Sequence, residues 1–158
     1  MKPLSNCILM TVGALIASTA LADAAPGDPA LARAADDSQL QWGPCPPFIP
    51  EGCGITVLHG DPAKPDFDVF FKVPGHSKIP AHWHTSPERM VLVSGELKVT
   101  YEGQPTATLK PGMYAYGPPR VHHRGECVSA EPCVLFIAFE APLDAMPVEK
   151  PKSAEKTK

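Results

Sequence analysis

Short runs in which hydrophobic and polar residues alternate recur along the middle of the chain. In the run "DFDVFFKV" every second residue is hydrophobic and shares one face of a strand: Phe67, Val69, Phe71 and Val73. The run "ELKVTY" repeats the pattern, with Leu97, Val99 and Tyr101 on one face. A period of two with one polar face predicts β-strands whose outer side meets water.

The run "CVLFIAF" is hydrophobic on both faces, so it needs cover on two sides. In "RMVLVSG", Val91 and Val93 are also expected on the outside, because the alternate residues Glu88, Met90 and Leu92 are expected to point inward. Two alternatives would cover these outer apolar residues. One is a second copy of the chain, and the other is the N-terminal segment "QWGPCPPFIP" with Trp42 and Phe48. We predict the first, a homodimer.

Prolines and glycines separate these runs, and there are 20 and 12 of them in the chain. Between Trp42 and Pro142, no stretch of ten or more residues shows helical spacing free of both residue types. This punctuation is typical of many short strands joined by turns. The sequence therefore predicts one all-β domain over residues 40–142, a β-sandwich or a small β-barrel whose interior can hold a ligand.

The two ends of the chain have a different composition. Residues 1–22 carry a lysine, then an apolar run and small residues, which is the build of a secretory signal peptide. The apolar run is much shorter than the ~20 residues that span a bilayer, so no membrane span is expected. Residues 23–39 and 143–158 show no apolar periodicity, which predicts a flexible N-terminal segment and a flexible C-terminal tail. We expect a soluble protein that is periplasmic or secreted.

Charge and cysteine content narrow the partners and the compartment. The 17 acidic residues exceed the 14 basic ones, and without a basic stripe neither nucleic acid nor an anionic membrane surface is expected as a partner. Four cysteines remain after the signal peptide, in the segments "CPPFIPEGC" and "CVSAEPC". Four cysteines allow three pairings. We favour the local one, Cys45 with Cys53 and Cys127 with Cys133, over a metal site built from the four thiolates, because C-x2-C spacing is absent.

Histidines gather in two short polar segments. In "AHWH" a strand would send His82 and His84 to one face, and the turn-prone "TSP" can bring Glu88 beside them. The segment "GPPRVHHRGE" supplies His122 and His123, of which one can point the same way. Three imidazoles and a carboxylate can hold one divalent metal ion and leave coordination positions open. His59 and His76 stand alone and are expected to be ordinary surface or core residues.

These two segments resemble the motifs of the cupin superfamily. The first motif is matched by Gly75, His82, His84, Glu88 and Gly95, and the second by Gly112, Pro118 and His123. Two positions depart from the second motif, since Arg120 stands where glycine is usual and Cys127 where asparagine is frequent. The resemblance extends over roughly residues 54–139. It implies a cupin-type β-barrel, a double-stranded β-helix of jelly-roll type.

The resemblance also implies a ligand set for one divalent transition metal (Fe, Mn, Ni, Cu or Zn): His82, His84, Glu88 and His123. Cupins include dioxygenases, decarboxylases, isomerases, lyases and non-catalytic binding proteins, so the fold does not select the reaction. We predict a metal-binding cupin, a metal-dependent dioxygenase for a small oxygenated or phenolic compound. The alternative is a non-catalytic module that binds a metal or a small ligand. Three residues near the second motif are candidates for orienting a substrate: Tyr114, Tyr116 and Arg120.

Overall fold

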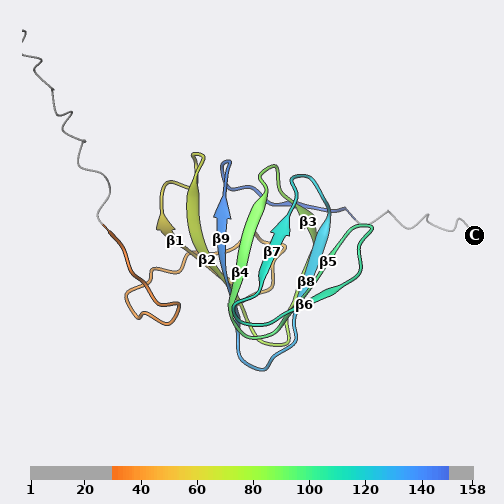
Figure 1. Ribbon diagram of the computed structural model, residues 1–158, viewed down its shortest axis with the longest axis horizontal. Helices are drawn as coiled ribbons and strands as arrows, with labels where there is room; N and C mark the ends of the chain where they lie inside the picture. Colours follow the sequence, from red (N-terminus) through yellow and green to blue (C-terminus); the bar gives the residue numbers. More distant parts are fainter. Residues whose placement is uncertain (1–29, 150–158) are drawn as a thin grey trace, which may run out of the picture. The chain divides into compact units, whose positions relative to one another are not determined.

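The computed structural model describes residues 30–149 of the 158-residue chain (Figure 1). The predicted signal peptide, residues 1–22, lies outside the described residues. Residues 33–149 belong to one compact unit, which holds ten strands. No helix occurs within the described residues, and thus none that could cross a membrane.

The strands form two antiparallel sheets of five strands each (Figure 1). From one edge to the other, each strand hydrogen-bonded to the next, the first sheet contains β1 (Gly54–His59), β2 (Phe67–Val73), β9 (Cys133–Phe139), β4 (Glu88–Ser94) and β7 (Tyr114–Gly117). The second contains β10 (Met146–Pro147), β3 (Lys78–Trp83), β8 (His123–Cys127), β5 (Leu97–Tyr101) and β6 (Ala107–Leu109). The all-β prediction is confirmed. The sequence predicted a β-sandwich or a small β-barrel, and the strands pair as two sheets.

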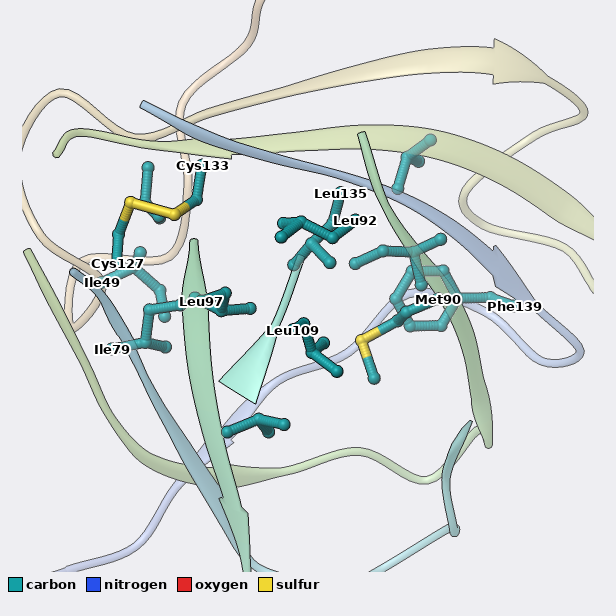
Figure 2. Packing of buried hydrophobic residues seen from close by; sticks show 14 of the residues in the cluster. Ile49, Ile79, Met90, Leu92, Leu97, Leu109, Cys127, Cys133, Leu135 and Phe139 are labelled. Atoms are coloured by element: carbon teal, nitrogen blue, oxygen red, sulfur yellow. A yellow bond between two sulfur atoms is a disulfide. The ribbon is translucent and has the colours of Figure 1, made fainter. Parts of the chain in front are cut away.

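Alternate residues of the strands meet between the two sheets and form the core (Figure 2). The inward residues of β5 are buried as the alternation predicts, with Leu97 at 3% and Val99 at 6% exposure. At the end of the sandwich that carries the histidines, Phe67 stacks on Phe139 with ring centroids 4.9 Å apart. Full burial of an aliphatic or aromatic side chain contributes about 1.5–3 kcal/mol, so this interior supplies the main stabilisation of the domain.

Both cysteine pairs follow the local pairing. Cys45 is joined to Cys53 and Cys127 to Cys133, with Cα atoms 5.8 Å and 5.7 Å apart. The second disulfide lies at the end of the core beside Ile49 and Leu97, and Met90 and Phe139 mark the opposite end (Figure 2). The disulfides therefore close short loops and leave no thiolate free for a metal among these four residues.

Apolar residues lie on the outer face of the first sheet, as the sequence indicated, and Arg89 and Lys72 share this face. Val93 is 38% exposed, and Val91 and Phe136 are half-buried. The N-terminal segment does not lie over this face as one unit. Trp42 lies against the ammonium group of Lys72, 3.9 Å from the ring centroid, whereas Phe48 turns inward to the core.

Residues 143–148, which the sequence assigned to the flexible tail, are held by backbone hydrogen bonds. The Leu143 N–H donates to Pro62 O at 2.8 Å, and the Val148 N–H donates to Ala81 O at 2.9 Å. Between them, β10 pairs with Trp83 and His82 of β3. Backbone hydrogen bonding does not require alternating side chains, which is why hydrophobic periodicity gave no sign of this segment.

Candidate metal centre

The ends of three strands bring three histidines and a glutamate together. His82 lies near the end of β3 and is the backbone partner of His123, the first residue of β8. His84 follows β3, and Glu88 begins β4 in the other sheet. The imidazole centroids are 4.3 Å apart for His82 and His123, and 4.9 Å apart for His82 and His84. The structure thus gathers the four residues that the sequence selected.

Each imidazole is oriented by a backbone carbonyl. The Nδ1 atom of His82 lies 2.8 Å from Pro80 O, and that of His123 lies 3.1 Å from Val121 O. His84 Nδ1 bonds to the carbonyl oxygen of Asp144. A carbonyl oxygen can only accept, so each Nδ1 must carry the proton and donate it. The Nε2 lone pairs are therefore left for another partner, as in metal-binding histidines.

Unsatisfied buried atoms in this cluster fit a cation. Oε1 of Glu88 lies 3.3 Å from His84 Nε2, and its Oε2 lies 3.3 Å from His123 Nε2. Neither His84 Nε2 nor Glu88 Oε2 has a hydrogen-bond partner, although both atoms are buried. One ligand atom from each histidine lies within 4.8 Å of the others. A divalent ion would satisfy these nitrogen and oxygen atoms together, so the residues present could hold a metal ion.

Burial sets the protonation of the cluster when no metal is bound. It lowers the pKa of His82, His84 and His123 to about 4, which leaves the three imidazoles neutral at pH 7. Burial raises the pKa of Glu88 to about 8, so this carboxyl keeps its proton at pH 7. A divalent ion would take the place of that single proton.

These pKa values predict how the stability of the metal-free protein depends on pH. The imidazoles have a pKa of about 4 in the folded chain against 6.5 unfolded, so their neutral burial costs stability as the pH falls from 6.5 to 4. Glu88 has the opposite effect, because its pKa is about 8 in the folded chain against 4.5 unfolded. The stability that its buried, protonated carboxyl contributes is therefore lost as the pH rises from 4.5 to 8. Between pH 4.5 and 6.5 the effect of the three imidazoles exceeds that of the single carboxyl, so the free energy of unfolding rises with pH up to about 6.5.

Urea unfolding of the metal-free protein from pH 4.5 to 8 is therefore expected to show maximal stability near pH 6.5. In Glu88→Gln the decline above that pH should disappear, while the decline below it remains. A stability that keeps rising up to pH 8 in the unmodified protein would contradict this assignment.

An interior cavity of about 410 Å³ adjoins the cluster. His82, His84, Glu88 and His123 line it, together with apolar residues of both sheets. The N-terminal residues Pro44–Pro46 and Ile49 and the C-terminal residues Leu143–Ala145 complete its wall. Such a volume, mostly apolar with a few polar groups, is typical of a small-molecule site.

Asp144 is a residue of this site that sequence reasoning missed. Besides the carbonyl contact to His84, its carboxylate accepts hydrogen bonds from Thr85, at 2.9 Å from the backbone N–H and 2.7 Å from the hydroxyl. The loop that carries His84 is thereby fixed to the C-terminal segment. No spacing in the sequence connects residues 85 and 144, because they lie 59 positions apart.

Loss of the Asp144 carboxylate should weaken metal binding. In Asp144→Ala the His84 loop loses two hydrogen bonds, while the backbone carbonyl that accepts from His84 remains. The affinity should therefore fall by about tenfold, the lower end of the range for loss of a ligand's direct partner. Competition with a fluorescent chelator measures the change. Glu149→Ala, an exposed acidic residue in the same segment, is the matched control and should bind as the unmodified chain does. Equal affinity of both variants would show that Asp144 does not position His84.

Tyr101 is a second residue that the sequence placed only in the core. Its ring lies 5.4 Å from that of His123, and its buried hydroxyl has no hydrogen-bond partner. Burial, reinforced by the charge of Glu88, raises the pKa of this phenol. A Cβ at Gly117 would lie 3.0 Å from Glu88 Oε2 and 3.3 Å from the Tyr101 hydroxyl, so glycine leaves room for both. The phenol can donate a hydrogen bond to a group bound at the cluster.

The structure separates the remaining candidates from the cluster. His122 is half-buried and pairs with Glu102, with His122 Nδ1 3.3 Å from the carboxylate, so His123 is the inward member of the pair. Tyr114 and Tyr116 are 58% and 49% exposed, because Ala115 between them takes the inward position on β7. None of these three lines the cavity.

Arg120 is also absent from the cavity wall, and it is exposed. Its φ angle of 62° lies in the left-handed region, which explains why glycine is usual at this position of the motif. Its backbone N–H donates to His84 O at 2.7 Å. Arg120 therefore contributes to the site through its backbone.

A family model matches part of the chain. Residues 69–139 match the model described as Cupin domain. This agrees with the resemblance noted in the two histidine motifs. A search of the curated proteins finds no significant match.

Several solved structures share the fold. The DMSP lyase DddQ from Ruegeria pomeroyi DSS-3 superposes with a TM-score of 0.59 at 20% identity, covering 73% of this chain and 64% of that one. The polyketide cyclase RemF from Streptomyces resistomycificus gives 0.62 at 15% identity, covering 77% and 89%. KdgF from Halomonas sp. gives 0.54 at 18%, covering 66% and 91%. The chain spans 63–64% of the DMSP lyase chains it matches. At these identities the likeness shows the fold alone.

Proposed function

We propose that His82, His84, Glu88 and His123 bind one divalent transition metal ion and that the protein is a metal-dependent enzyme. The observation that carries the proposal is the cluster of buried, unsatisfied ligand atoms beside a cavity. The reaction class that we propose is dioxygenation of a small oxygenated or phenolic compound. When bound, the metal would supply Lewis-acid or redox chemistry at its open positions.

The chain's own residues would prepare the site for this chemistry. Three carbonyl oxygens fix the imidazoles, and Asp144 with Thr85 holds the loop of His84. The Tyr101 hydroxyl has no protein partner and lies beside the His123 ring, so it would donate to a group bound on the metal and not to the body of a ligand in the cavity, which Tyr101 does not line. The apolar wall of the cavity would exclude water from the reacting group and strengthen these polar contacts.

Reconstitution of the metal-free protein tests the proposal. Iron, manganese, nickel, copper and zinc are supplied one at a time, and bound metal and oxygen uptake are measured with a panel of catechols and diketones. We expect one equivalent of bound metal and oxygen uptake with at least one pair of metal and substrate. If the protein binds metal but takes up oxygen with none of the pairs of metal and substrate, the dioxygenase proposal is contradicted.

A non-catalytic metal- or ligand-binding module is the second candidate, and one observation favours it. Among the described residues at the cluster, the groups beside the four ligands are poor bases. The carboxylate of Asp144 is engaged by Thr85, and the raised pKa of Tyr101 keeps its phenol protonated. A zinc ion closed off from exchangeable water would support this candidate, whereas a redox metal with open positions would support the enzyme.

We also propose that residues 1–22 are removed during export and that the mature protein works in the periplasm or outside the cell. Two local disulfides support an oxidising compartment. Residues 40–142 would then be the cupin domain, to which residues 143–148 are hydrogen-bonded. N-terminal sequencing of exported protein is expected to begin near Asp23, and a start at Met1 would contradict the proposal.

The apolar outer face of the first sheet supports a homodimer. Val91 is paired with Phe136 on one side and with Tyr114 on the other, which makes a continuous outward row across β9, β4 and β7. Val93 continues this face and is 38% exposed. Burial of such a surface against a second copy would remove apolar area from water.

The double variant Val91→Glu with Val93→Lys should convert the dimer to monomers that still bind metal, because two charges would be desolvated at the interface. Light scattering of the mature protein gives the oligomeric state, and metal analysis gives the integrity of the site. Lys98→Glu, on the exposed face of the other sheet, should leave the dimer intact. If the unmodified protein is monomeric at micromolar concentration, the dimer does not exist.

A further inference from the structure

Aliphatic side chains form most of the cavity wall away from the histidine cluster. The wall includes Ile79 from β3, Leu97 and Val99 from β5, and Leu135 and Ile137 from β9. These residues are only 3–6% exposed, so they belong to the interior. A wall of this kind is stabilised by contact with apolar groups and destabilised by contact with polar groups that it cannot pair.

The residues that line the cavity include both the histidine cluster and Leu97, so its chemistry differs from one end of β5 to the other. Tyr101 is paired with His123 at the cluster end of β5, and Leu97 is paired with Cys127 four residues away. Four residues of a strand extend over about 13 Å. An occupant that reaches from the cluster to Leu97 would therefore meet nitrogen and oxygen ligand atoms at one end and aliphatic groups at the other.

The charges at the cluster limit the head group of such an occupant. A divalent ion with three neutral imidazoles and the Glu88 carboxylate would carry a net charge of +1. Two further charged residues line the cavity, Arg124 and Asp144. Their charges are opposite, so the net charge of the site stays at +1. A buried site favours neutrality, so a head group with a single negative charge fits the metal. A second charge further along the ligand would lie against the aliphatic wall without a partner.

From this arrangement we propose that the ligand of the cavity is an amphiphilic monoanion. Its head binds the metal through oxygen atoms, and its apolar body extends along Val99 and Leu135 toward Leu97. The inference rests on the proposed function, since the head requires a metal in the cluster. It assigns the ligand class and excludes dianions and polyhydroxylated molecules as the preferred occupants.

A chain-length series tests the inference. The protein, loaded with the metal that the reconstitution experiment retains, is titrated calorimetrically with n-alkyl hydroxamates from acetohydroxamate to decanohydroxamate. The affinity should rise about two- to fourfold for each added methylene and level off once the cavity is filled. Metal-free protein should not bind acetohydroxamate.

Cavity variants locate the alkyl chain. Val99→Leu adds bulk inside the cavity, and Val93→Leu makes the same change on the outer face as a matched control. Val99→Leu should make the affinity level off at a shorter chain, with acetohydroxamate binding unchanged, and Val93→Leu should change neither. Leu97→Phe, at the far end of the cavity, should also make the affinity level off at a shorter alkyl chain. This variant replaces Val99→Leu in the experiment if Val99→Leu does not fold.

Each failure has its own meaning. If the protein binds no metal, the proposed function falls and this inference falls with it. If metal and acetohydroxamate bind but the affinity is independent of chain length, the alkyl chain lies outside the cavity and this inference alone is overturned. Tighter binding of a dicarboxylate such as malonate than of octanohydroxamate would overturn it as well.

Discussion

His82→Ala, His84→Ala and His123→Ala should each reduce metal affinity by more than 100-fold. Each change removes one nitrogen from a cluster whose ligand atoms lie within 4.8 Å of one another. Loss of an outer partner alone costs about 10- to 100-fold, and loss of a ligand atom must exceed that. The measurement is the dissociation constant by competition with a chelator of known affinity, at pH 7.5.

His122→Ala is the matched control, because it removes an imidazole from the adjacent position. His122 is half-buried and pairs with Glu102, so its loss should leave the affinity unchanged. His59→Ala and His76→Ala, at exposed positions, should behave in the same way. If His122→Ala empties the site and His123→Ala leaves it full, strand β8 has the opposite register from the one described.

Gly75→Ala should strongly destabilise the domain. A Cβ at this position would lie 2.1 Å from the backbone oxygen of Ala130 and 2.8 Å from that of Ser129. These atoms belong to the loop that the Cys127–Cys133 disulfide closes, and the His76 N–H donates to Ser129 O at 3.1 Å. The contact is relieved only by moving backbone, which we expect to cost about 3 kcal/mol or more.

Gly43→Ala is the control for the chemical change itself. The nearest atom to its Cβ would be Ile55 O at 3.6 Å, an ordinary contact, so its stability should change by about 0.5 kcal/mol at most. Urea unfolding monitored by tryptophan fluorescence gives both free energies of unfolding. Equal stability of the two variants would show that Gly75 is not needed for close approach of the two loops.

Alternation and motif spacing predicted the strands and the cluster because both depend on local geometry. The inward faces of β2 and β5 follow from a period of two, and the H-x-H spacing places His82 and His84 on one side of a strand. The choice between His122 and His123 needed the register of β8, which pairs His123 with His82 and Tyr101. The sequence does not carry that register by itself.

The parts that the sequence did not predict depend on contacts between distant segments. Asp144 meets His84 through a backbone oxygen, which no side-chain pattern records. In the sequence Tyr101 alternates with polar residues just as the core residues Leu97 and Val99 do. Only the folded chain brings its hydroxyl to the cluster, beside His123. Tyr114 and Tyr116 were selected for their nearness to the second motif, although the small Ala115 between them takes the inward position.

The N-terminal segment shows the same limit. The alternative to the dimer is that the segment "QWGPCPPFIP" covers the outer face with both Trp42 and Phe48. The turn-rich stretch between them sends the two rings to different sides, with Phe48 5.7 Å from the His82 ring and Trp42 beside Lys72. Prolines and a disulfide fix this path, and alternation cannot describe it.

Metal analysis of the protein isolated from its own compartment, combined with X-ray absorption at the edge of the metal found, tests the central claim most directly. We predict one equivalent of a divalent transition metal per chain, with the scattering pattern of three imidazoles, which is reduced to two in His123→Ala and unchanged in His122→Ala. Protein that contains no metal as isolated, and that binds none when iron, manganese, nickel, copper or zinc is supplied, would contradict the account.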